Sequence, residues 1–169
     1  MVFVSSGAAQ RPPGALPPLS ALTARAALVD TSGKTIGDAL LRETPNGVLL
    51  QVDLASAEAG VHAFHIHETG RCDRPAFESA GGHFAPGGAE HGLLNAKGPH
   101  AGDLPNVHVP RDGRLSFEYL IARVTLRPGD RSLLDADGSA LVMHRDRDDY
   151  TTDPAGSAGD RIACGVVMR

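Results

Sequence analysis

The eight histidines of this 169-residue chain, together with one nearby aspartate, carry its clearest chemical signal. Imidazole is the commonest metal-binding side chain, and imidazoles rarely gather for packing reasons alone. We therefore predict two neighbouring metal sites, with seven candidate ligands: His65, His67, His83, His91, His100, Asp103 and His144. His62 lies close to the first pair in sequence, whereas His108 falls outside the group.

Two parts of this cluster have spacings that suit metal binding. His65 and His67 are two residues apart in a segment predicted to be a strand, so both side chains leave one face and can bind one ion. His91, His100 and Asp103 need one more ligand to complete a tetrahedral zinc site. A zinc-hydrolase motif is excluded, because His67-Glu68 would require a histidine at position 71, which is arginine.

The elements that must position these residues are short strands. Val48, Leu50, Val52 and Leu54 alternate with Leu49, Gln51 and Asp53, which is the two-residue period of a strand with one apolar face. We expect about eight strands, near residues 22–30, 34–43, 47–55, 60–67, 113–121, 123–127, 139–144 and 161–168. No segment has a convincing helical period. Many short strands separated by turn residues are typical of an all-β sandwich or flattened barrel.

Three segments depart from this pattern. Residues 68–112 and 145–160 are rich in Gly, Pro and Asp, and we predict two long functional loops, since long structureless loops in compact domains are usually functional or disordered. Residues 1–21, with four prolines, predict a flexible leader ahead of a domain at 22–169. A net charge of −4 makes nucleic acid an unfavourable partner, and no apolar run reaches the roughly 20 residues of a membrane span.

Cys72 and Cys164 are too few for a thiolate metal cage. Their spacing is compatible with one long-range disulfide and equally with two separate buried thiols.

Several motifs occur in the order found in one known family. They lie at residues 60–67, 79–84, 91–92, 100–103, 140–144 and 159–165. Together they resemble copper,zinc superoxide dismutase. The amino-acid sequences of residues 98–106 and 149–165 resemble those of its bacterial branch. The resemblance covers the chain from about residue 22 onwards, and it implies an eight-stranded Greek-key β-sandwich.

The resemblance also implies a role for each matched residue. It assigns copper to His65, His67, His83 and His144, and zinc to His83, His91, His100 and Asp103. His83 would thus bridge the two ions. Arg161 would attract the anionic substrate, Asp148 would link a copper ligand to a zinc ligand, and His62 would support the copper site from beneath. Cys72 and Cys164 would form the family's disulfide.

The activity implied is the conversion of superoxide to dioxygen and hydrogen peroxide, which protects against oxidative stress. One rival is a domain that stores or delivers copper without turnover, but all four copper positions and Arg161 are filled here. A copper-only dismutase is a second rival, and His91, His100 and Asp103 count against it. We expect a periplasmic protein, with the cytoplasm as the alternative because no signal peptide is visible, and monomer versus homodimer stays open.

Overall fold

The alternation of apolar and polar residues in the first strands builds the core of the protein. A computed structural model describes residues 22–169, so the predicted leader at 1–21 lies outside the described residues, and the division into leader and domain stays a prediction. In β1 (Thr23–Asp30), Ala24, Ala26 and Leu28 are buried and their neighbours Thr23, Arg25 and Ala27 are exposed. Residues two apart share one face of a strand, so this pattern directs that face into the interior.

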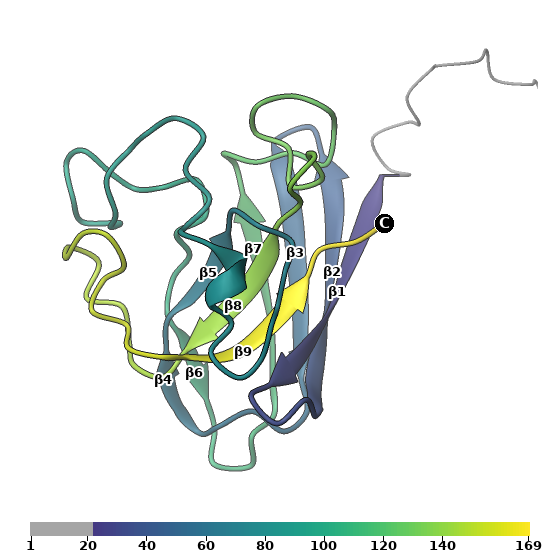
Figure 1. Ribbon diagram of the computed structural model, residues 1–169, viewed down its shortest axis with the longest axis vertical. Helices are drawn as coiled ribbons and strands as arrows, with labels where there is room; N and C mark the ends of the chain where they lie inside the picture. The colour runs from purple at the N-terminus through teal and green to yellow at the C-terminus, as the bar shows by residue number, and fades with distance from the viewer. Residues whose placement is uncertain (1–21) are drawn as a thin grey trace, which may run out of the picture.

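The remaining strands pair with β1 or with one another in two antiparallel sheets, and the larger sheet curls into a half-barrel (Figure 1). They are β2 (Thr35–Thr44), β3 (Gly47–Leu54), β4 (Gly60–His62), β5 (Phe64–His67), β6 (Val107–Val109), β7 (Leu115–Ile121), β8 (Ala140–His144) and β9 (Arg161–Val166). Six of them form a seven-stranded sheet with β1, in the order β5-β8-β9-β1-β2-β3-β7, and β4 pairs with β6 in a second sheet. The main core fills the curl and includes the fully buried Leu28, Leu41, Leu50, Leu126 and Leu141.

The expected all-β class is confirmed, although one expected strand is interrupted and another does not form. The predicted strand at 60–67 is interrupted at Ala63, whose N–H donates to the carbonyl of Asp146 and whose carbonyl accepts from the N–H of His144. Ala63 alone separates β4 from β5, and it therefore joins the two sheets. If β4 and β5 are taken as one interrupted strand, the described residues contain the expected eight strands.

The number of strands agrees only because one expected strand is absent and one unexpected strand is present. No strand forms at 123–127, where Leu126 N (2.6 Å) and Thr125 Oγ1 (2.8 Å) donate hydrogen bonds to the buried carboxylate of Glu43. Conversely, β6 lies inside the segment predicted to be a loop. Its three residues are too few to show a periodic pattern in the sequence.

Two long loops lie at the same side of the half-barrel (Figure 1). Between β5 and β6 the chain contains one short 3₁₀ helix, η2 (Glu78–Ala80), and otherwise turns and irregular backbone. The segment between β8 and β9 contacts this first loop, since Leu94 N donates to the carbonyl of Tyr150 and His91 N donates to Asp153 Oδ1. Among residues 22–169, no helix has the length and apolar character needed to cross a bilayer.

Candidate metal centre

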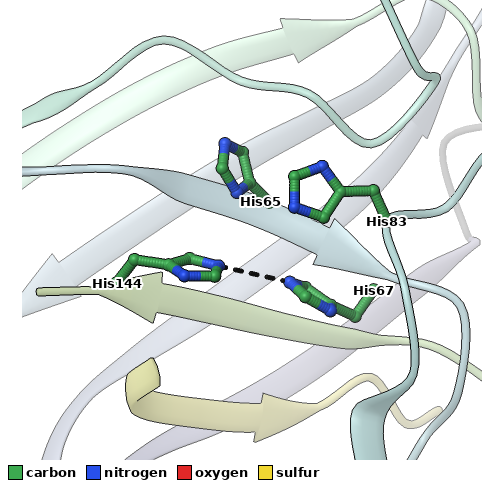
Figure 2. Close-up of side chains that lie close together, drawn as sticks. All are labelled: His65, His67, His83 and His144. Atoms are coloured by element: carbon green, nitrogen blue, oxygen red, sulfur yellow. Dashed lines mark hydrogen bonds between the residues drawn. The ribbon is translucent and has the colours of Figure 1, made fainter. Parts of the chain in front are cut away.

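Four imidazoles converge where β5, β8 and the first long loop meet (Figure 2). His65 and His67 come from β5, His144 ends β8, and His83 comes from the loop. The ring centroids of His65 and His83 are 4.1 Å apart, and His67 Nε2 lies 3.4 Å from His144 Nε2. All four side chains are buried, and each offers a ring nitrogen close enough to the others to hold a single metal ion.

A second group shares His83 with the first. Asp103 Oδ1 lies 2.9 Å from His83 Nδ1 and 3.2 Å from Nδ1 of both His91 and His100. Three imidazoles and one carboxylate are a set of ligands that zinc commonly takes in proteins. Asp103 Oδ2 accepts the backbone N–H groups of Gly92 and His100, which fixes the orientation of the carboxylate.

The unpaired nitrogens of these groups face the positions where metals would sit. His65 Nδ1, His83 Nε2 and His91 Nδ1 are buried and have no hydrogen-bond partner among the described residues. Buried polar atoms are nearly always paired, so three such atoms in one cluster need an explanation. A bound ion at each group would satisfy them, and the donor sets therefore fit two metals.

Burial favours the neutral form of three of these imidazoles. Desolvation lowers the pKa of His67 to about 2, of His144 to about 3 and of His83 to about 4. Neutral imidazole is the form that binds metals, so at neutral pH these rings are ready to act as ligands. His91 differs: desolvation opposes its charged form, but the neighbouring carboxylates of Asp103 and Asp148 prevail and raise its pKa to about 9.

Asp148 connects the two groups, as the resemblance implied. Its Oδ2 accepts from His65 Nε2 at 2.8 Å, and its Oδ1 accepts from His91 Nε2 at 3.0 Å. Burial works against the charged carboxylate, yet the hydrogen bonds from both histidines hold its pKa below the usual range. A carboxylate that accepts one ring N–H fixes the tautomer and leaves the other nitrogen free for a metal.

Arg161 lies beside the first group, at the start of β9. Its Nη1 donates to the carbonyl of Phe77 and its Nη2 to that of Gly81, each at 2.7 Å. The Gly81 oxygen also accepts from His67 Nδ1 at 3.0 Å. These two carbonyls were not foreseen from the sequence, because any residue type can supply a backbone oxygen.

His62 and the two cysteines complete the surroundings of the site. His62 is buried, and its Nδ1 lies 2.9 Å from the carbonyl oxygens of His144 and Arg145. Cys72 and Cys164 form a disulfide with their Cα atoms 5.7 Å apart, which confirms the pairing implied by the resemblance. All the predicted site residues therefore lie in one region, while their individual metal roles stay predictions.

A β half-barrel with two adjoining histidine-rich groups that share one imidazole is the architecture of a binuclear metalloprotein. The sequence from residue 35 to 167 matches the family model described as copper/zinc superoxide dismutase (SODC). The chain therefore belongs to the copper/zinc superoxide dismutase family, whose members are oxidoreductases that use copper and zinc.

Individual relatives agree with this family. The chain is 49% identical over 148 residues to "Superoxide dismutase [Cu-Zn] 2" of Aquifex aeolicus, a match that covers 86% of each chain. A crystal structure of a SOD-like protein from Bacillus subtilis is similar with a TM-score of 0.81 and 39% identity, covering 84% of this chain and 96% of that one. Cu/Zn superoxide dismutase from Brucella abortus is similar with a TM-score of 0.68 and 27% identity, covering 86% and 99%.

Proposed function

We propose that this chain dismutates superoxide at the centre built around His83. In the overall reaction one superoxide loses an electron and becomes dioxygen, while a second gains that electron and two protons and becomes hydrogen peroxide. The observation that carries the proposal is the position of His83 between the two groups, with Nδ1 against Asp103 and Nε2 buried without a partner. A site for storage alone would not need one imidazole to belong to both groups.

The proposed ligands follow from the two groups. His65, His67, His83 and His144 would hold copper, and His83, His91, His100 and Asp103 would hold zinc. When bound, copper supplies a redox change between Cu(II) and Cu(I), which zinc does not undergo. An all-nitrogen set suits copper, and the mixed nitrogen and oxygen set suits zinc.

His83 and Arg161 would act on the substrate. His83 Nε2 is the nitrogen shared with the first group, so it can hold a proton and pass it to reduced substrate. Arg161 uses two of its five N–H donors on Phe77 and Gly81, which leaves others to bind and orient a small anion. Asp148 and His62 would support the ligands without touching the substrate.

The decisive experiment combines metal analysis of the purified protein with a superoxide assay. We expect about one copper and one zinc per chain together with rapid superoxide consumption. In a His144→Ala variant, copper and activity should fall while zinc is retained, because His144 belongs to the first group only. Full copper and zinc loading with no superoxide consumption would instead favour copper storage or delivery.

We propose further that the protein resides in the periplasm, as a monomer or a homodimer. The Cys72–Cys164 disulfide supports this compartment, because structural disulfides persist mainly in oxidising compartments. Fractionation of cells that express the complete natural gene product tests the compartment. Light scattering on the eluting peak of a sizing column distinguishes the two states, and a mass of 17.6 kDa per particle would contradict the dimer.

A further inference from the structure

The orientation of the Asp148 carboxylate determines how the two metal groups are linked. This carboxylate is fully buried and accepts hydrogen bonds from His65 Nε2, His91 Nε2 and the backbone N–H of Tyr150, the last at 2.6 Å. A rotation or shift of Asp148 would therefore move one imidazole from each group. Contacts from another segment must fix the position of Asp148, because the loop that carries it has no regular strand pairing.

Asn106 holds the backbone of Asp148 from the other long loop. Its side-chain amide pairs with Asp148 at two points: Nδ2 donates to the carbonyl of Asp148 at 2.9 Å, and Oδ1 accepts the N–H of Asp148 at 2.8 Å. This is the pattern of a neighbouring strand, supplied by a side chain. It fixes the position of Asp148 only as firmly as Asn106 itself is fixed.

Tyr150 in turn fixes the position of Asn106. Its hydroxyl oxygen accepts the backbone N–H of Asn106 at 2.8 Å. Tyr150 has a φ of 65°, a left-handed conformation that is uncommon for a residue other than glycine. In this conformation its N–H reaches the Asp148 carboxylate while its ring reaches Asn106. Such strained backbone persists where the surrounding contacts determine it, and it gathers at functional sites.

The three residues therefore form a closed ring of contacts, which we call the clasp (Asn106, Asp148 and Tyr150). We infer that the Tyr150 hydroxyl is a positioning group that, through the clasp, holds the link between the two metal groups. It acts through Asn106 and Asp148 and touches neither substrate nor metal. This inference rests on the proposed function, since it requires zinc to bind at the second group.

Tyr150→Phe is the direct test, because it removes one oxygen and leaves the backbone contacts of Tyr150 in place. Tyr119→Phe is the matched control, since Tyr119 is the only other tyrosine in the chain and lies on β7. Three measurements are needed: the rate of zinc release from copper- and zinc-loaded protein to a pyridylazo-resorcinol chelator, the visible spectrum with cobalt(II) in place of zinc, and the melting temperature of the metal-free protein.

We expect Tyr150→Phe to release zinc about three- to tenfold faster than wild type, the range one hydrogen bond commonly contributes. Its cobalt spectrum should also change, because His91 would reorient, while the metal-free melting temperature should match that of Tyr119→Phe. An unchanged zinc release rate would overturn the inference, and so would faster release with an unchanged cobalt spectrum. Wild-type protein that binds no zinc would instead overturn the proposed function.

Discussion

The guanidinium of Arg161 donates a 2.7 Å hydrogen bond to the carbonyl oxygen of Gly81. That oxygen also accepts from the ring of His67, so one backbone carbonyl joins the proposed anion-binding cation to a proposed copper ligand. The segment that carries Gly81 is in turn tied to β9 by the Cys72–Cys164 disulfide. The position of Arg161 thus depends on a loop with little secondary structure of its own.

Replacing Arg161 by alanine should lower kcat/KM for superoxide by about tenfold or more, because the local positive charge that attracts the anion is lost. The dependence of kcat/KM on ionic strength should weaken at the same time, since salt acts by screening that attraction. Arg25→Ala, at an exposed position on β1, is the control and should change neither quantity appreciably. A salt dependence that stays as steep in Arg161→Ala as in wild type would show that other charges steer the substrate.

Removing the disulfide with paired Cys72→Ala and Cys164→Ala substitutions should lower the free energy of unfolding. The bridge spans 92 residues, and the chain-entropy model gives about 4–5 kcal/mol for a loop of this size. We also expect kcat/KM to fall, because the Phe77 and Gly81 carbonyls that orient Arg161 lie on the tethered segment. Denaturant unfolding and the superoxide assay check the two parts separately. Full activity in a destabilised variant would show that the loop positions Arg161 without the disulfide.

The sequence predicted the side-chain ligands better than it predicted the contacts that fix their positions. Histidines such as His65 and His67 could be found because their residue type and spacing carry the chemistry. The oxygens of Phe77 and Gly81 could not, since a backbone carbonyl leaves no mark in the sequence. Tyr150 was also missed, because its role depends on a contact with Asn106 that only the folded loops create. The expected strand at 123–127 does not form, and its Leu126 N–H donates to the distant Glu43, a contact that the local sequence pattern does not show.

The metal-free protein should lose stability as the pH falls from about 6.5 to 4. Burial lowers the pKa of His83 to about 4 and those of His67 and His144 further, whereas an unfolded histidine titrates near 6.5. In this window the unfolded chain binds more protons than the folded one, so acid favours unfolding. Asp103 and Asp148 add to the loss only below about pH 5, where unfolded carboxylates begin to protonate.

Melting temperatures of chelator-treated protein across this range measure the effect. His108→Gln alters an exposed histidine outside both groups and should leave the slope unchanged. His83→Gln should make the slope shallower, since it removes one of the three imidazoles whose pKa is lowered by burial. A melting temperature that is constant between pH 6.5 and 4 would contradict neutral buried imidazoles. The raised pKa of His91 has the opposite sign: its contribution is complete below about 6.5 and is lost as the pH rises through about 9.

Gly156→Ala should disrupt the link between the two metal groups more than any other single methyl group added to the loop at 145–160. A Cβ atom at this position would lie 1.9 Å from Asp148 Oδ1 and 2.7 Å from His91 Nε2, so it would force the carboxylate away from the imidazole. Gly88→Ala is a closely matched control, because both glycines have a φ of +64° but a Cβ at Gly88 meets no atom within 4 Å. Both variants therefore place a side chain at the same left-handed φ, and only Gly156→Ala adds the collision. We expect Gly156→Ala to bind zinc at least about tenfold more weakly than Gly88→Ala in a chelator competition, since it breaks a buried hydrogen bond to a charged group. Equal zinc affinity in the two variants would mean that the contact between Asp148 and His91 does not support the zinc site.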